Sequence, residues 1–183
     1  PFGEHLRLER FRLGNGLELF VLPDASAPIL SYHTWFQVGS RHERPGKTGI
    51  SHLLEHMMFL GTDAVPEGTF DRSLEAAGGE NNAATWTDWT YYYENVPASE
   101  LGLVVRLESD RMANLAVTAE RFRSERDVVV SERRDRVEDD VEGAASELLY
   151  ATAFGRTHGY HWPTIGWMRD IERLTKKDAF AHY

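Results

Sequence analysis

Residues 52–56 read His52-Leu53-Leu54-Glu55-His56, and this stretch decides how the rest of the chain is interpreted. Two residues four apart on an α-helix are separated by about 40° around its axis, so both imidazoles project from one face. Neutral imidazole suits zinc, and a catalytic zinc site has three protein ligands and a water in the fourth position. Glu55 borders the same face, where its carboxylate can take a proton from metal-bound water without being a ligand. The stretch therefore predicts two metal ligands and a general base on one helix.

The residues around this motif form an amphipathic helix. Apolar side chains recur at the i, i+3, i+4, i+7 and i+8 positions of a buried helix face. They are Ile50, Leu53, Leu54, Met57 and Met58. The other face carries the two histidines, Glu55 and Phe59, whereas a solvated face would carry Lys, Glu or Gln. The motif reverses the commoner His-Glu-x-x-His order and matches its inverted form. A metal site is therefore favoured over a plain polar helix surface.

Composition limits the fold and the partners. A chain of 183 residues, 42% of them hydrophobic, suffices for one domain with a real core. It has no cysteine, which excludes disulfides and thiolate ligands. A formal net charge of −9, with no basic stripe, argues against nucleic acid as a partner.

Targeting signals are not evident in the sequence. No apolar run approaches the ~20 residues of a membrane span, and no signal peptide is visible. The chain begins at Pro1 without an initiating methionine, so we expect a leader or an earlier segment to be missing. The compartment is left open, and both periplasm and cytoplasm are compatible.

The order of the expected elements favours an α+β fold, a mostly antiparallel sheet covered by helices. Gly14-Asn15-Gly16 predicts a tight turn between two β-like runs, the first of which starts near Leu6. A third strand at about 29–38 has β-branched and aromatic residues on both faces, which predicts that both are covered. Two more strands are expected at about 80–86 and 90–96.

Helices are expected between and after these strands. Thr48 is a plausible N-cap for the motif helix, and a second helix at 66–77 should stop at Gly78-Gly79. Another helix should begin near Pro97. Two short ones are expected later, near residues 165–174 and from Lys176 onward.

The longest helical stretch is expected at 118–153, interrupted only by Gly143. Arg126 and Arg133 intrude on its apolar stripe, and they should pair with buried carboxylates or face a missing partner surface. The expected core stripe consists of Phe122, Val129, Val130, Val137, Val141, Ala144 and Leu148.

A third ligand must come from outside the motif. His158 and His161 are candidates, as are many carboxylates. Glu132 is the best of these, because it and Glu125 lie seven apart on one stripe of the long helix. A carboxylate at the margin of a core needs a partner, and zinc can be that partner. The residue pattern alone leaves an equal alternative, in which both glutamates are ordinary surface acids.

Further motifs lie on both sides of the histidines. They are Gly39-Ser40-Arg41 with Glu43, Gly49, Phe59-Leu60-Gly61-Thr62, Asn82-Ala83-Ala84-Thr85 with Tyr92-Tyr93, and Pro163-Thr164-Ile165-Gly166 with Asp170-Ile171. Over nearly its whole length the chain resembles the N-terminal, metal-bearing half of the pitrilysin family of inverted-motif zinc peptidases. That family includes insulin-degrading enzyme and the mitochondrial processing peptidase β subunit. Its glutamate ligand follows the motif by some 75 residues, the number between His56 and Glu132 here.

The resemblance implies a role for each site residue. His52, His56 and Glu132 would bind Zn²⁺, Glu55 would be the general base, and Glu125 would orient a ligand. Asn82 and Ala83 would hold an extended peptide at the sheet edge. A turn or bulge residue after Gly78-Gly79 is the alternative for Asn82.

The resemblance also implies the activity and the partners. Residues 1–183 would be an N-terminal zinc-peptidase domain, incomplete at its C-terminal end, that hydrolyses internal bonds of unstructured peptides or proteins. A second, homologous half absent from this chain would complete the enzyme, in one polypeptide or as a partner subunit. The first rival is a non-catalytic binding or assembly subunit, but such relatives usually lose a ligand or the base. The second is a hydrolase such as the autoinducer synthases, which use a cysteine ligand.

Overall fold

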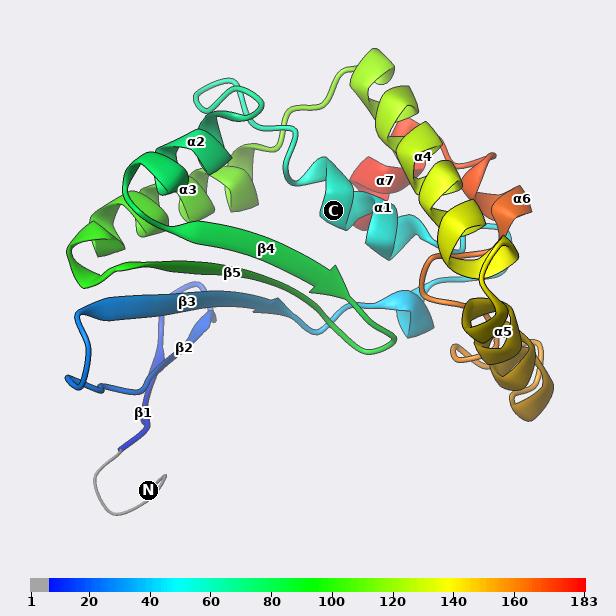
Figure 1. Cartoon of the computed structure of the whole chain (residues 1–183), viewed down its shortest axis with the longest axis horizontal. Helices are drawn as coiled ribbons and strands as arrows, with labels where there is room; N and C mark the ends of the chain where they lie inside the picture. Colours follow the sequence, from blue (N-terminus) through cyan, green and yellow to red (C-terminus); the bar gives the residue numbers. More distant parts are fainter. Residues whose placement is uncertain (1–6) are drawn as a thin grey trace.

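The computed structural model describes residues 7–183, and it has the α+β architecture expected from the sequence (Figure 1). The expected position at Leu6 lies outside the described residues. Two antiparallel sheets are present, a hairpin of β1 and β2 and a three-stranded sheet in the order β3-β5-β4. The strands are β1 Glu9–Arg12, β2 Glu18–Val21, β3 Ile29–Phe36, β4 Glu80–Thr85 and β5 Thr90–Pro97. The α-helices are α1 Ile50–Met57, α2 Thr69–Ala76, α3 Leu101–Asn114, α4 Ala119–Arg133, α5 Val141–Ala153, α6 Met168–Ile171 and α7 Lys176–His182.

Helices cover one face of the three-stranded sheet. Along β5, burial alternates, so Tyr92, Glu94 and Val96 are buried and their neighbours are partly exposed. Helices α2 and α3 lie over this buried face, while β1 and β2 lie on the opposite side of the sheet (Figure 1). One apolar cluster joins α2 and α3 to β5, through Phe70, Leu74, Val96, Val104 and Leu107.

A second core surrounds α1. It joins that helix to β5, α4, α6 and α7, through residues that include Leu53, Met57, Tyr92, Phe122, Val129, Ile171 and Ala179. Leu53 and Met57 have no exposed surface. The apolar stripe expected of the motif helix is thus buried, which turns its other face toward α4 and β4.

The third strand differs from its expectation. Its burial alternates, with Thr34 buried while Ile29 and Trp35 are 70% and 56% exposed. The prediction that both faces are covered is wrong for the described residues. The outward aromatic rings pack along the strand surface instead, since Trp35 stacks on Tyr91 of β5 with centroids 4.6 Å apart.

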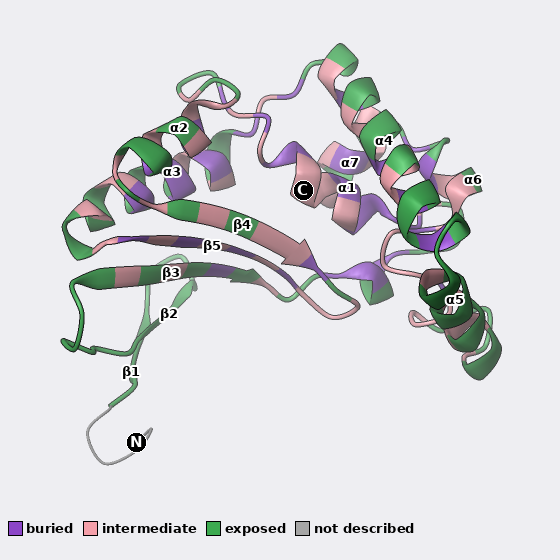
Figure 2. Ribbon diagram, in the orientation of Figure 1, coloured by how far each residue is buried: buried purple, intermediate pink, exposed green. Residues whose placement is uncertain are grey.

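The long helix expected at 118–153 is broken. Helix α4 ends at Arg133, a π-helical turn follows at Arg134–Glu138, and α5 starts after Asp140. The side chain of Asp140 accepts a hydrogen bond from the backbone N–H of Gly143, so the break comes before the glycine rather than at it. Because α5 turns away from the core, it buries none of its residues (Figure 2). Val141 and Leu148 are 84% and 68% exposed, contrary to the expected stripe.

Two shorter helices are also smaller than expected. The helix expected at 66–77 spans Thr69–Ala76, and the one expected at 165–174 contains only Met168–Ile171. Within the described part of the chain, no helix has the length and apolar character to cross a membrane.

Candidate metal centre

Helix α1 is held at its N-terminus by a buried glutamate from the preceding loop. The backbone N–H groups of Gly49 and Ser51 donate to the two carboxylate oxygens of Glu43, each at 2.8 Å. These N–H groups have no partner inside the helix, and the helix dipole favours a negative charge there. Thr48 is therefore not the cap that the sequence predicted. Its hydroxyl donates to Asp170 at 2.7 Å instead.

A close approach at Gly49 fixes the start of α1. Gly49 has φ +85°, and a Cβ at this position would lie 2.4 Å from the carbonyl oxygen of Ile165. Only glycine combines this left-handed backbone with so near a neighbour. The motif helix is thus seated on the loop that precedes α6.

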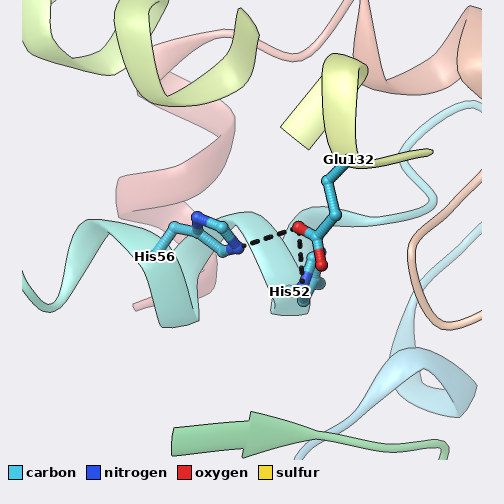
Figure 3. Close-up of side chains that lie close together, drawn as sticks. All are labelled: His52, His56 and Glu132. Carbon is cyan, nitrogen blue, oxygen red and sulfur yellow. Dashed lines mark ion pairs between the residues drawn. The ribbon is translucent and has the colours of Figure 1, made fainter. Parts of the chain in front are cut away.

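Three side chains converge between α1 and α4. The Nε2 atoms of His52 and His56 lie 3.6 Å and 3.2 Å from Oε2 of Glu132. Figure 3 shows the carboxylate of Glu132 facing both imidazoles. One ligand atom from each of the three lies within 4.8 Å of the others. The structure therefore brings together the three ligands expected from the resemblance.

The spacing of these atoms fits a tetrahedral zinc ion. With metal–ligand distances of about 2.0–2.1 Å, tetrahedral ligands lie roughly 3.3 Å apart, close to the two nitrogen–oxygen distances here. Oε2 of Glu132 is also shielded from solvent and receives no hydrogen bond from the described residues. A buried carboxylate oxygen needs a donor or a cation, so the donor set fits zinc.

Two arginines follow Glu132 in the sequence, and one of them contacts it. Arg136 contacts its other oxygen, Oε1, at 3.0 Å, which leaves Oε2 facing the histidines. Arg133 is buried and donates to Glu147 of α5 at 2.7 Å and to the carbonyl of Gly166 at 2.8 Å. Arg133 thus pairs with a carboxylate, but Glu147 is only partly buried, whereas a buried carboxylate was expected.

The other arginine on the stripe behaves differently. Arg126 donates to the backbone carbonyls of Glu172 and Leu174 at 3.2 Å and 3.4 Å. It therefore joins α4 to the segment after α6 and does not pair with a buried carboxylate.

Glu125 lies seven residues before Glu132 on α4, about two helical turns from it. Its Oε2 is 3.5 Å from Nδ1 of His56, the ring nitrogen that faces away from Glu132. A carboxylate there can hold the imidazole with Nε2 turned toward a metal. This position agrees with an orienting role for Glu125.

The two histidines have opposite charge preferences without a metal. Burial, helped by the nearby His56, lowers the pKa of His52 to about 4. Burial also disfavours the charged form of His56, but the carboxylates of Glu125 and Glu132 outweigh it and raise its pKa to about 9. The carboxylates of Glu125 and Glu132 thus favour a positive charge on His56, whereas burial favours the neutral form of His52.

Glu55 lies beside the three ligands and is held by the sheet. Its Oε2 accepts a hydrogen bond from the hydroxyl of Thr85 on β4, at 2.5 Å. Burial raises the pKa of Glu55, although the Thr85 hydrogen bond acts in the opposite direction. A raised pKa suits a group that must both accept and release a proton near neutral pH. The sequence motifs included Thr85 but gave it no role, and only its position two residues after Ala83 hinted at the same strand face.

An open cavity of about 880 Å³ connects this centre to one edge of the sheet. Its lining includes the motif residues, Asn82 and Ala83 of β4, and Glu125, Glu132 and Arg136. β4 is one of the two edge strands of its sheet in the described residues. Hydrogen-bonded pairs alternate in antiparallel strands, and Trp86 N donates to Trp89 O. In the register that pairs Ala83 with Tyr92, the N–H and C=O of Ala83 therefore point away from β5, toward the open edge.

The two other candidate histidines lie elsewhere. His158 stacks on Phe154, with ring centroids 4.8 Å apart, and Nδ1 of His161 is 3.0 Å from the Phe154 carbonyl oxygen. Neither belongs to the cluster of possible metal ligands in residues 7–183. Both instead organise the loop after α5.

Comparison with known proteins agrees with this geometry. Residues 20–161 match the model of the insulinase family (peptidase family M16). The zinc protease PqqE of Helicobacter pylori is 35% identical over 171 residues, covering 93% of this chain and 38% of that protein. A protein of Mycobacterium leprae named as an uncharacterised zinc protease is 36% identical over 174 residues, covering 95% of this chain and 39% of that protein.

Solved structures show the same fold. A protease from Helicobacter pylori superposes with a TM-score of 0.94 at 34% identity, over 97% of this chain and 42% of that one. The first half of the periplasmic protease PqqL from Escherichia coli gives 0.85 at 24% identity, over 96% of this chain and 39% of that one, a likeness of fold alone. The chain spans about two fifths of the length of these relatives. It belongs to the insulinase family of peptidases, family M16.

Proposed function

We propose that this chain is the metal-bearing domain of a zinc metalloendopeptidase that hydrolyses internal bonds of unstructured peptides or proteins. The observation that carries the proposal is the convergence of His52, His56 and Glu132 beside Glu55, at the wall of an open cavity. Such a set of three ligands with an adjacent carboxylate is the arrangement of a hydrolytic zinc site. The zinc-protease names of its relatives support the same chemistry.

The residues of the chain divide the work between binding and proton transfer. Zinc, when bound, would polarise the scissile carbonyl and lower the pKa of a bound water to ~7. Glu55 would accept a proton from the attacking water and deliver it to the leaving amine. Glu125 and Arg136 would keep His56 and Glu132 in position, since Glu125 contacts Nδ1 of His56 and Arg136 contacts Oε1 of Glu132, which leaves Nε2 and Oε2 to hold the metal.

The substrate would bind as an extra strand along β4. The outward N–H and C=O of Ala83 can pair with an extended peptide, which places that peptide in the cavity beside Glu55. The N–H of Ala83 now donates to the side-chain oxygen of Asn82 at 2.8 Å. The side-chain oxygen of Asn82 would therefore accept the Ala83 N–H hydrogen bond until a substrate carbonyl takes its place. Main-chain pairing of this kind requires a locally unfolded substrate. It depends little on the substrate's amino-acid sequence, because backbone groups make the hydrogen bonds.

A second homologous half would complete the enzyme, and the 183 residues would be its N-terminal domain. The first half of PqqL is a separate solved structure, and the chain also matches 21% of the length of whole PqqL. The open face of the cavity offers room for another domain to enclose the peptide.

A non-catalytic subunit is the alternative in this family. A domain of Pseudomonas fluorescens described as inactive shares the fold, with a TM-score of 0.86 at 15% identity. The presence of all three ligands and of Glu55 in the present chain favours the catalytic interpretation.

Replacing Glu55 by glutamine tests the proposal. Glutamine keeps the size of the side chain but cannot accept the proton, so zinc content should stay near one per chain while turnover falls by ~10² or more. Metal analysis and cleavage of an unstructured peptide, with the homologous half supplied, measure the two effects. Glu142→Gln, on the exposed surface of α5, is the control for loss of one charge. Loss of zinc from Glu55→Gln would make Glu55 a ligand and overturn the mechanism.

A further inference from the structure

Thr85 directs its hydroxyl group to a carboxylate on another element. The residue is 7% exposed, and its Oγ1 donates across the interface between β4 and α1 to Oε2 of Glu55 at 2.5 Å. Thr90, the partner of Thr85 across the hairpin, is equally buried but satisfies its hydroxyl on the backbone carbonyl of Val38, at 2.9 Å. The Thr90 hydroxyl also lies 3.3 Å from Oγ1 of Thr85 and can donate to it. Thr85 instead holds a charged side chain on another element.

The hydrogen bond restrains one oxygen of Glu55 and leaves the other available. Among the described residues, none donates a hydrogen bond to Oε1 of Glu55. A glutamate has three rotatable side-chain bonds, and Glu55 lines a wide cavity, so without a fixed oxygen its carboxylate could adopt several rotamers. A bond to a buried strand residue selects one of them.

The same strand also carries the proposed substrate edge. Ala83 and Thr85 are two apart, so their backbones share the direction toward the open edge and their side chains share the direction toward α1. The same strand, β4, therefore sets the position of a peptide paired with Ala83 and the position of the Glu55 carboxylate held by Thr85. The distance between the peptide and the carboxylate then varies little, because residues two apart on one strand hold both.

We propose that Thr85 is a positioning residue for Glu55, which uses its hydroxyl to hold the general base in register with the peptide bound along β4. The inference rests on the proposed peptidase function. Thr85 itself neither contacts the substrate nor transfers a proton in the reaction.

Kinetics of matched variants of the full enzyme provide the first test. Thr85→Val keeps the shape but removes the hydroxyl, so kcat should fall roughly 10- to 100-fold while KM and zinc content change less than about twofold. Thr85→Ser keeps the hydroxyl and should recover most of the lost kcat. An unchanged kcat in Thr85→Val would overturn the proposal, as would a Thr85→Ser enzyme as slow as Thr85→Val.

Thr34 supplies a matched control in the same sheet. It is 9% exposed and donates its hydroxyl to the carboxylate of Glu108 on α3 at 2.7 Å, outside the cavity. Thr34→Val thus removes a similar buried hydrogen bond and should lower stability but leave kcat unchanged. A fall in kcat equal to that of Thr85→Val would mean that general loosening of the sheet explains both variants.

A second readout needs no catalysis. In the metal-free chain, Thr85→Val, Glu55→Ala and the double variant form a thermodynamic cycle measured by urea unfolding. Hydrogen bonds to charged groups predict a coupling of about tenfold or more in the unfolding constant. If the effects of the two single substitutions simply add in the double variant, the hydrogen bond between Thr85 and Glu55 is refuted. If Thr85→Val does not fold, Thr85→Ala takes its place in all of these experiments. If the parent cleaves no peptide in any assembly, the peptidase proposal fails while the cycle still decides the bond.

Discussion

The buried cap of α1 should make the stability of the protein depend on pH. Burial raises the pKa of Glu43 from 4.5 to about 7, although the N–H groups of Ser51 and Gly49 favour its charged form. A carboxyl group whose pKa is raised on folding binds more protons in the folded than in the unfolded state between these values. Its contribution to stability is therefore fully present below pH 4.5 and is lost as the pH rises through 7.

The magnitude follows from the two pKa values. With a pKa of 4.5 in the unfolded chain and about 7 in the folded one, linkage gives a loss of roughly 2.5 kcal/mol between pH 5 and pH 8. Other groups titrate over this range as well. Comparing the parent with Glu43→Gln at each pH cancels their effect, because the substitution removes only the Glu43 titration.

Urea unfolding of the metal-free parent and of Glu43→Gln at pH 5 and pH 8 measures this difference. The stability of the parent relative to the variant should fall by roughly 2.5 kcal/mol from the lower to the higher pH. Glu120→Gln, an exposed acid in the first turn of α4, controls for the change of charge. A parent-to-variant difference that stays constant between the two pH values would show that Glu43 caps α1 as a carboxylate throughout, and would refute the argument from burial.

Three further outcomes are expected. Alanine at any one ligand should abolish stoichiometric zinc binding in metal analysis, because two remaining ligands hold zinc poorly, and unaltered binding by Glu132→Ala would move the third ligand to Glu125. The 183-residue chain alone should bind zinc but cleave unstructured peptides slowly, since positioning by the second half is absent, and full activity of the isolated chain would contradict this. Gly143→Ala should lower the thermal midpoint although alanine favours helices, because its Cβ would lie 1.9 Å from the carbonyl oxygen of Arg136; an unchanged midpoint would exclude this close packing. The single-ligand variants are His52→Ala, His56→Ala and Glu132→Ala.

The sequence predicted those features that depend on local spacing. The buried stripe of α1 and its polar face follow from helical periodicity, and the hairpin turn follows from Gly14-Asn15-Gly16. Glu132 was different. Periodicity places two glutamates on one stripe, which surface acids explain equally well, and only the family resemblance singles out Glu132 as a ligand. The packing of α4 against α1 is a tertiary contact that no local pattern encodes.

The errors have the same origin. The predicted helix at 118–153 contains no proline, and its only glycine lies inside α5, so nothing local marked the π-helical turn at Arg134–Glu138. That turn places Arg136 against Glu132, and it is stabilised by Arg133, which reaches a loop over 30 residues away. Thr48 does not cap α1 because Asp170, 122 residues away, takes its hydroxyl, and Glu43 of the preceding loop binds the helix end instead. In each case a longer-range partner overrode the nearest local signal.

The separation of the three ligands along the chain has a consequence for folding. His52 and His56 come together as soon as one helix forms, but 75 residues lie between His56 and Glu132. A zinc ion held by all three would act as a cross-link between α1 and α4, in a chain that has no cysteine to form one. Closing a loop of that length lowers the conformational entropy of the unfolded chain by the equivalent of roughly 4.5 kcal/mol. The metal would therefore clamp the two helices in the way a disulfide does, and a chelator would release the clamp without breaking a covalent bond.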